Sequence, residues 1–411
     1  MVEKSCEIAV IGAGIIGLSC ALRLARDGHE VTLIAPEDDE TGASYGNAGV
    51  IADYAVLPVG TPAVLRNLPA LLFDRDSPLS LRPSIAIAPW LLRFARESLP
   101  RRAAENARAI AALTACAAPS WREFADEIAA TTILKPLGSL YLLETEADRR
   151  AATLEPYHAH GVEAELIDRD MLGQLQPGLP DDRGLGAVFF PRTITIDDPS
   201  EMMRSLRHAL ECAPVTRLNA RVTTLVREGR KMALHTQQGV LNAAKVVLAA
   251  GAWSRELAAQ IGDRVPLDTE RGYHLEYDSP APRLLRQMTP VARGFYFCPM
   301  AGRLRVAGTV ELGGRDRPAS PRRWKMLERG ARAILPDLPT PDRRWMGCRP
   351  SLPDSRPVIG PSATAGAQVI HAFGHGHLGL TLAPLTARLV AALIAEKAPE
   401  VDLAPYRANR F

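Results

Sequence analysis

The sequence has few of the features that mark secreted, metal-binding or nucleic-acid-binding proteins. Its six cysteines are scattered along the 411-residue chain: Cys6, Cys20, Cys116, Cys212, Cys298 and Cys348. No C-x-x-C pair occurs, so we expect reduced thiols, without disulfides or a thiolate metal site. None of the nine histidines stands at metal-ligand spacing from a cysteine or carboxylate, and no metal is predicted. The net charge of +3 is too small for a nucleic-acid surface.

Long apolar runs are missing as well. None reaches the roughly 18–20 residues that a membrane-spanning helix needs. The polar residues before the first strand leave no room for a signal peptide, so we expect a cytoplasmic protein. Aliphatic helical stripes between residues 54 and 130 would allow peripheral contact with the inner face of a membrane. Core packing is the commoner role of such stripes, and no Lys/Arg cluster flanks them on one face.

What is present begins with a βαβ unit near the N-terminus. A β-branched run at residues 8–11 predicts a buried parallel strand, and an apolar helix and a second strand at 31–34 follow. Gly12, Gly14 and Gly17 form G-x-G-x-x-G between the first strand and the helix, which is the context of a dinucleotide-binding turn. An acid that binds ribose is expected at the end of the second strand, but Ala35 stands there. Glu37 and Asp38 follow at once, so we expect a displaced carboxylate in this role and assign it to Glu37.

Three later segments are also rich in small residues, and two of them follow a predicted strand. Residues 41–50 predict a loop along a cofactor, and the strand at 246–249 ends at Gly251. The strand at 369–373 leads through a glycine loop into a helix near residues 381–396. Short antiparallel strands at 273–277, 294–297 and 304–308 lie between them. We predict an α/β fold with two domains: residues 1–60, 190–255 and 341–411 bind the cofactor, and residues 61–189 and 256–340 hold the substrate.

In this order the motifs resemble the FAD-dependent D-amino-acid oxidase superfamily. Within it they are most similar to the D-amino-acid dehydrogenases of the small-subunit type and to D-hydroxyproline dehydrogenases. The segments that carry the resemblance are G-x-G-x-x-G, Gly46–Val50, Leu248–Ser254, Thr269–His274, Gly347–Pro350 and Gly374–Gly379. The resemblance implies a glutathione-reductase-like FAD-binding domain with a Rossmann-type βαβ unit. It also implies an α+β substrate domain built on an antiparallel sheet.

The resemblance implies FAD, which we expect to be non-covalent because Arg349 beside Cys348 fits the non-covalent pattern. It places the cofactor against Gly12, Gly14, Ile15, Ile16, Gly17, Glu37, Ser44, Asn47, Ala48, Gly49, Val222, Ala250, Gly251, Trp253, Gly374, His375, Gly376, His377, Leu378 and Gly379.

Arg349 matches the arginine that holds the substrate carboxylate in several members of this family. A planar guanidinium suits that role, because two parallel charge-assisted bonds fix one face of the α-carbon. Tyr273, His274 and His377 are further candidates for catalysis. Tyr273 and His274 point to opposite faces of an ideal strand, so they share one pocket only if a bulge intervenes. A loop histidine bonded to backbone is the simpler reading of His377.

The resulting hypothesis is oxidative deamination of a D-amino acid, or of a cyclic D-imino acid such as D-proline or hydroxy-D-proline, by hydride transfer to flavin N5. None of the six lysines lies in a cofactor motif, which favours a dehydrogenase over an oxidase. Electrons would pass to a quinone, a partner flavoprotein or an iron–sulfur protein, and an oligomer is compatible with this role. The alternatives are a sarcosine- or glycine-type amine oxidase that releases hydrogen peroxide, and a flavin-bearing component of a hetero-oligomeric dehydrogenase.

Overall fold

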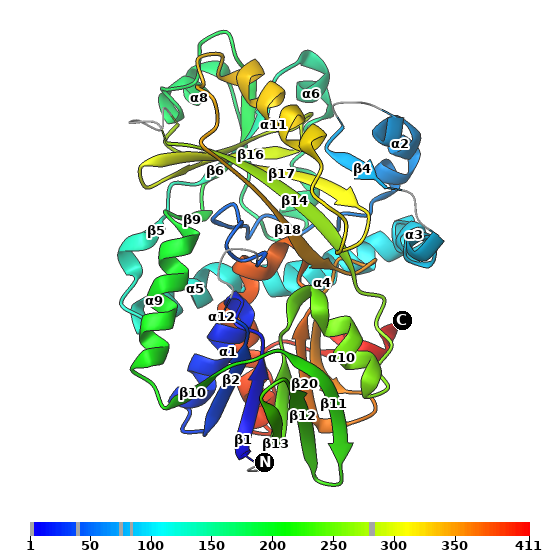
Figure 1. Cartoon of the computed structure of the whole chain (residues 1–411). Helices are drawn as coiled ribbons and strands as arrows, with labels where there is room; N and C mark the ends of the chain where they lie inside the picture. The colour runs from blue at the N-terminus through cyan, green and yellow to red at the C-terminus, as the bar shows by residue number, and fades with distance from the viewer. Residues whose placement is uncertain (1–3, 38–41, 74–76, 83–84, 279–283) are drawn as a thin grey trace.

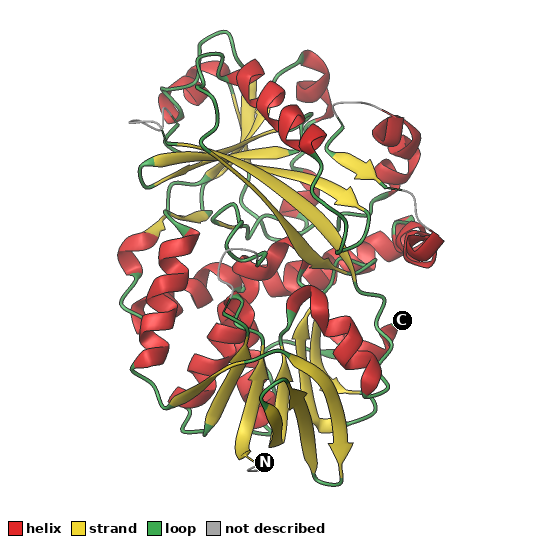
Figure 2. Cartoon of the chain, in the orientation of Figure 1, coloured by secondary structure: helices red, strands yellow, loops and turns green. Residues whose placement is uncertain are grey.

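The protein is described from a computed structural model, which covers residues 4–37, 42–73, 77–82, 85–278 and 284–411. Its strands form two large sheets, one at the bottom and one at the top of Figure 1, with the chain passing several times between them. Figure 2 shows helices packed around both sheets. The fold is α/β, with one unit built on a Rossmann-type βαβ arrangement and a second unit built on a mainly antiparallel sheet.

The first sheet has a parallel centre and carries an antiparallel hairpin at one edge. Its parallel strands, in spatial order, are β10 (Val215–Asn219), β2 (Val31–Ala35), β1 (Lys4–Ile11), β13 (Gly239–Leu248) and β20 (Gly366–Phe373). The antiparallel strands are β11 (Val222–Glu228), β12 (Lys231–Thr236) and β19 (Val358–Ser362).

Both faces of this sheet are buried, and β1 shows why its sequence is a continuous apolar run. Ile8 and Val10 pack on one side with helices α1 (Ile15–Arg26) and α12 (Gly379–Ile394). Ala9 and Ile11 pack on the other side with α10 (Ser254–Gln260). Successive side chains of a strand alternate between faces, so a strand covered on both sides needs apolar residues at every position. The predicted βαβ unit is confirmed.

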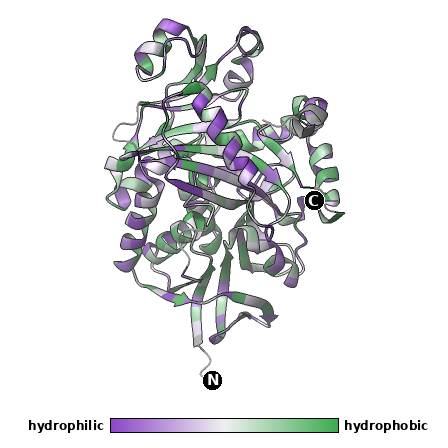
Figure 3. Cartoon of the chain, turned by 45° about the horizontal axis from the view of Figure 1, so that its top comes forward, coloured by the Kyte–Doolittle hydropathy of each residue, from purple (hydrophilic) through white to green (hydrophobic). Residues whose placement is uncertain are grey.

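The second sheet is antiparallel along most of its length. Its strands run in the order β18 (Arg343–Ser351), β14 (Asp268–Tyr277), β17 (Arg303–Leu312), β16 (Phe295–Met300), β15 (Gln287–Pro290), β6 (Ser139–Leu143), β8 (Gly186–Phe190) and β7 (Glu165–Ile167), and β4 (Leu79–Leu81) pairs with β17. Helix α11 (Pro321–Ile334) buries Met326, Leu327 and Ala331 against it. Figure 3 shows that the helices at the outside of the molecule carry hydrophilic as well as hydrophobic residues.

A short three-stranded sheet and the remaining helices lie around these two sheets. The short sheet contains β3 (Val50–Ile51), β9 (Ile194–Ile196) and β5 (Leu134–Lys135). The helices are α2 (Pro62–Phe73), α3 (Ala88–Glu97), α4 (Pro100–Thr114), α5 (Ala117–Glu127), α6 (Glu146–Ala151), α7 (Glu155–His158), α8 (Arg169–Leu175) and α9 (Pro199–Glu211).

The predicted division of the chain needs two corrections. Residues 343–351 were assigned to the first domain, but as β18 they pair with β14 in the second sheet. Helices α4 and α5 were assigned to the second domain, but they pack on α12 beneath the first sheet. The indole Nε1–H of Trp121 on α5 donates to the Leu380 carbonyl at 2.9 Å, which ties α5 to the start of α12. In both cases, contacts with segments distant in the sequence determine the unit to which these residues belong.

The expectation that no segment is long and apolar enough to span a membrane is also wrong. By length and composition, the helical segment Gly376–Ile394 could cross one. In this structure 72% of that segment is buried, because α12 packs against α1, α4 and α5. Burial on all sides explains the composition, since a helix inside a core carries apolar residues all round.

Candidate active site

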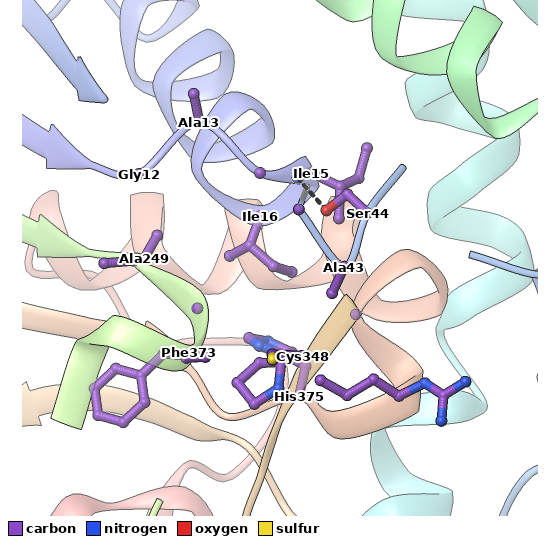
Figure 4. Close-up of a pocket in the computed structure, with 18 of the residues that line it drawn as sticks. Gly12, Ala13, Ile15, Ile16, Ala43, Ser44, Ala249, Cys348, Phe373 and His375 are labelled. Carbon is purple, nitrogen blue, oxygen red and sulfur yellow. Dashed lines mark hydrogen bonds between the residues drawn. The ribbon is translucent and has the colours of Figure 1, made fainter. Parts of the chain in front are cut away.

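A cavity of about 430 Å³ lies between the two sheets and is lined by most of the predicted cofactor residues. Its walls come from the turn after β1, the segment after β2, the ends of β13 and β20, and strands β16 to β18. Figure 4 shows residues from these separate segments facing one space. The cavity therefore joins the carboxyl ends of the parallel strands to one face of the second sheet, where an α/β fold places its ligands.

The glycine turn forms one end of the cavity and requires glycine at position 12. Gly12 has φ +107°, and a Cβ there would lie 2.4 Å from the carbonyl oxygen of Ala249. The turn directs the first N–H groups of α1 toward the cavity. The N–H of Ile15 donates to Ser44 Oγ at 3.0 Å (Figure 4). A helix N-terminus of this kind stabilises a phosphate, which agrees with the predicted pyrophosphate site.

The ribose end lacks the expected acid. Ala35 lines the cavity, but Glu37 does not. Its backbone N–H donates to Asn219 Oδ1 at 3.0 Å, and Asn219 Nδ2 donates to Glu37 Oε2 at 3.1 Å. The prediction that Glu37 reaches the ribose is therefore corrected, because Asn219 at the end of the neighbouring strand β10 holds its side chain. Val222, Ala250, Gly251 and Trp253 line this part of the cavity as predicted.

Most residues of the two segments predicted to follow the cofactor line the cavity, and the others lie just outside its lining. Ile16, Ser44, Asn47 and Ala48 line the cavity, as do Gly374, His375, Gly376, His377 and Gly379. Gly17, Gly49 and Leu378 do not. Gly17 packs against the backbone of Gly12, Gly49 donates its N–H to Asn47 Oδ1 at 2.8 Å, and Leu378 is buried in a hydrophobic cluster. These three residues support the residues that line the cavity without lining it themselves.

Arg349 reaches the cavity from β18, and the backbone around it fixes its guanidinium. Arg349 Nη1 donates to the Thr309 carbonyl at 3.1 Å. A Cβ at Gly272 would lie 2.4 Å from Arg349 Nη2, so the guanidinium lies directly against this glycine. Thr309 has φ +63° and belongs to a bulge, where Thr309 and Val310 of β17 lie opposite Gly272 of β14. Strained backbone held by surrounding structure is common at functional sites.

The two histidines of the glycine loop are neutral at pH 7. Burial lowers the pKa of His375 to about 3, and its Nε2 lies 3.0 Å from Thr386 Oγ1. Burial and the nearby Arg349 charge lower the pKa of His377 to about 4. Neutral imidazole both donates and accepts a hydrogen bond, so His377 can contact a polar atom in the cavity without adding charge.

Tyr273 and His274 lie outside the cavity lining, which corrects the prediction that pocket residues fall at these positions. The Tyr273 hydroxyl donates to Glu311 Oε1 at 3.0 Å, and its ring packs edge-on against Trp324. His274 stacks on Trp345 and approaches the Gly46 carbonyl at 3.4 Å. Both are buried and have different partners, and neither side chain lines the cavity.

The sequence analysis missed an aromatic wall beside Arg349. Tyr54 and Tyr296 line the cavity. Behind them, Tyr54 stacks on Phe190 with ring centroids 4.4 Å apart and meets Tyr141 edge-on at 5.5 Å. The hydroxyls of Tyr141 and Tyr296 are hydrogen-bonded to each other. These residues come from segments far apart in sequence, and no local motif marks them.

Cys348 lines the cavity next to Arg349 in β18. Burial raises the pKa of its thiol, so the protonated thiol is the stable form at neutral pH. All six cysteines are free. Over the described ranges, no three His, Cys, Asp or Glu side chains gather in a group that could hold a metal ion.

Fold and cavity together define the class. A glycine turn that excludes a Cβ, a helix N-terminus aimed into the space and a cavity that reaches a partly buried arginine fit a flavin dinucleotide. They are the features of a two-unit flavoprotein oxidoreductase. The profile of the family described as FAD dependent oxidoreductase matches residues 7–393. The chain belongs to this family, and it is an enzyme that depends on FAD.

Curated proteins and solved structures agree with this assignment. The chain is 33% identical to a D-amino-acid oxidase of Bradyrhizobium diazoefficiens, over 98% of this chain and 99% of that protein. It is 32% identical to D-amino acid dehydrogenase 2 of Ralstonia nicotianae, over 98% of this chain and 100% of that protein. The crystal structure of glycine oxidase from Geobacillus kaustophilus matches with a TM-score of 0.77 at 23% identity, over 99% of each chain, which supports the fold.

Proposed function

We propose that this enzyme is a D-amino-acid dehydrogenase, in which Arg349 binds the carboxylate of the substrate. The observation that carries the proposal is a partly buried guanidinium that lines the same cavity as the glycine loop of residues 374–379 and lies near His377 of this loop. A carboxylate held there by two parallel bonds presents one face of its α-carbon to the loop side of the cavity. The curated relatives named as D-amino-acid oxidase and D-amino acid dehydrogenase support the substrate class.

The residues around Arg349 orient the substrate and exclude water. Gly272 and the Thr309 carbonyl hold the guanidinium, and Tyr54 and Tyr296 offer an apolar wall for the substrate side chain. His377 is neutral, so it accepts a hydrogen bond from the amine without repelling it. FAD, when bound, supplies the acceptor for the hydrogen and electron pair that leave the α-carbon. We propose that this FAD is non-covalent, which the protonated Cys348 thiol supports.

A quinone or a partner redox protein is the proposed electron acceptor. No lysine lies among the residues that line the cavity in the described part of the chain, which removes one aid to the reaction of reduced flavin with oxygen. The relative from Bradyrhizobium is named an oxidase, so oxidation by oxygen with release of hydrogen peroxide is the second candidate. A third is a component of a larger complex that holds FAD but oxidises no substrate alone.

We also propose that the protein is cytoplasmic and that α3 touches the inner face of the membrane. The outer face of α3 carries Leu92, which is 74% exposed, beside the exposed Arg93 and Arg96. The sequence analysis found no Lys/Arg cluster beside the apolar stripes, whereas the structure exposes these two arginines next to Leu92. An apolar side chain flanked by arginine suits an anionic lipid surface. The inward face, with Trp90 and Phe94, packs near Val310, next to the carbonyl that holds Arg349.

Sedimentation with vesicles tests this contact. Vesicles containing phosphatidylglycerol should retain the protein at low salt and release it at high salt, and Leu92→Ser should weaken retention. Leu166→Ser is the matched control, because Leu166 is 48% exposed on a different element, β7. Absence of sedimentation at low salt would refute the proposed contact with the membrane.

Anaerobic mixing tests the activity. The flavin band near 450 nm should bleach with a D-amino acid and not with its L-isomer, across a panel that includes D-proline and cis-4-hydroxy-D-proline. Arg349→Met should remove bleaching at low substrate while FAD remains bound, at a cost of about 2–5 kcal/mol in substrate binding. Arg344→Met is the control, because Arg344 is exposed on the same strand.

The outcomes separate the candidates. A yellow protein that no substrate bleaches would favour the role as a component of a larger complex. Bleaching followed by rapid recovery in air, with hydrogen peroxide, would favour the oxidase. Equal bleaching by Arg349→Met and the wild type would refute the role of Arg349.

A further inference from the structure

We propose that Glu270 is the resting counterion of Arg349, and that a substrate carboxylate binds Arg349 together with a proton that Glu270 takes up. Glu270 then acts as a positioning residue that couples binding to pH. The inference rests on the proposed role of Arg349 as the carboxylate site.

The register of the second sheet brings the two residues together. Glu270 of β14 lies directly opposite Arg349 of β18, and residues opposite each other in an antiparallel pair share one face of the sheet. Glu270 is 4% exposed and does not line the cavity, so a ligand in the cavity meets Arg349 and not Glu270. Its side chain also bonds to Ser351, two residues further along β18 on the same face.

The surrounding charges leave Glu270 dependent on Arg349. On the opposite face of β14, Arg271 donates to Glu311 at 2.8 Å, so that buried pair is complete without Glu270. The other titratable groups near Arg349 in the described ranges are Cys348, His377 and Tyr296, and all three are neutral at pH 7. Within the described ranges, Arg349 is the cation that acts on Glu270, and burial still raises the pKa of this carboxyl above its usual range.

A second carboxylate changes this balance. One buried guanidinium cannot stabilise two buried anions as well as it stabilises one, because like charges in a low dielectric disfavour each other's ionised form. The substrate carboxylate reaches Arg349 from the cavity, while Glu270 is buried outside the cavity lining and cannot move into solvent. Glu270 therefore takes a proton from solvent as the substrate binds. Above the pKa of Glu270 in the free site, affinity should fall with rising pH, because each binding event consumes a proton.

The test uses the FAD-loaded enzyme and benzoate, a carboxylate without an amine or an α-hydrogen. Its Kd is followed through the flavin spectrum between pH 6 and pH 9. The wild type should lose affinity by a factor approaching ten per pH unit. Calorimetry in two buffers of different ionisation enthalpy should report an uptake approaching one proton. Glu270→Gln should bind benzoate with a flat pH profile and without proton uptake, while Glu201→Gln, the same change at an exposed residue of α9 outside the cavity lining, should keep the slope.

Three results overturn the proposal: a flat wild-type profile, the wild-type slope in Glu270→Gln, or no proton uptake. If Glu270→Gln does not fold, the calorimetric measurement on the wild type still tests whether binding of benzoate takes up a proton. Failure of the proposed function gives a different pattern. In that case Arg349→Met would bind benzoate as tightly as the wild type does.

Discussion

Adding one methyl group at Gly272 should disable the carboxylate site while leaving the fold intact. A Cβ there would lie 2.4 Å from Arg349 Nη2 and 2.5 Å from Arg349 Cζ. Carbon contacts are favourable from about 3.5 Å, so the guanidinium must retreat by about 1 Å. Gly272 does not have a positive φ, so alanine meets only this steric conflict.

The expected loss follows from the hydrogen bonds that the displaced guanidinium can no longer make. A misplacement of about 1 Å costs on the order of 100-fold in rate, and one charge-assisted hydrogen bond contributes about 1.5–3 kcal/mol. Gly272→Ala should therefore lower kcat/KM for a D-amino acid by roughly 10- to 100-fold, mainly through KM. The atoms in conflict are the end of a flexible side chain, so the free energy of unfolding should fall by no more than about 1.5–3 kcal/mol, the contribution of the charge-assisted bond to the Thr309 carbonyl.

The assay is steady-state oxidation with a dye acceptor, with Tm and the flavin spectrum as checks on folding. Gly173→Ala is the matched control, because a Cβ at this position in α8 meets nothing within 4 Å. If kcat/KM of Gly272→Ala equals that of the wild type, the guanidinium position seen here does not determine substrate binding, and the reasoning is wrong.

Two further predictions concern the cofactor end and acid stability. Gly12→Ala should abolish retention of FAD and lower Tm, because φ +107° and the Ala249 carbonyl at 2.4 Å both exclude a Cβ; full flavin content after purification would contradict this. Burial lowers the pKa of His274 and His375 to about 3, so below about pH 6.5 the unfolded chain binds protons that the native protein does not. Stability should be complete above that pH and fall toward pH 5 with a limiting slope of about 1.4 kcal/mol per pH unit for each histidine, as measured by urea unfolding. The slope should be smaller in His375→Gln, and an unchanged slope would count against the burial argument.

The parts of this protein that the sequence predicts correctly depend on local geometry. The turn at Gly12, the apolar run of β1 and the glycine loop at residues 374–379 each show their role within a short window, because a positive φ, burial on two faces and a helix start are local constraints. Arg349 was found through its resemblance to a family motif and lies in the cavity.

The parts that were missed or misplaced depend on pairing between distant segments. Glu270 faces Arg349 only because β14 pairs with β18 in one register, and no pattern near residue 270 indicates this. Tyr273 belongs to a strand that was predicted correctly, but Glu311 on β17 captures its hydroxyl. The position of Tyr296 beside Tyr54 likewise joins segments more than 200 residues apart. Sequence periodicity identifies strands, whereas their neighbours in the sheet decide which side chains reach the cavity.

The two sheets contribute different halves of the site, and they share no strand among the described residues. The glycine turn and the loop at residues 374–379 belong to the first sheet, while Arg349, Tyr296 and the bulge at Thr309 belong to the second. A change in the second sheet can alter which substrate is held without rebuilding the nucleotide cradle. Substrate range and redox chemistry can therefore diverge independently in this architecture, and exchanging β16 to β18 between relatives is a direct route to new substrate preferences.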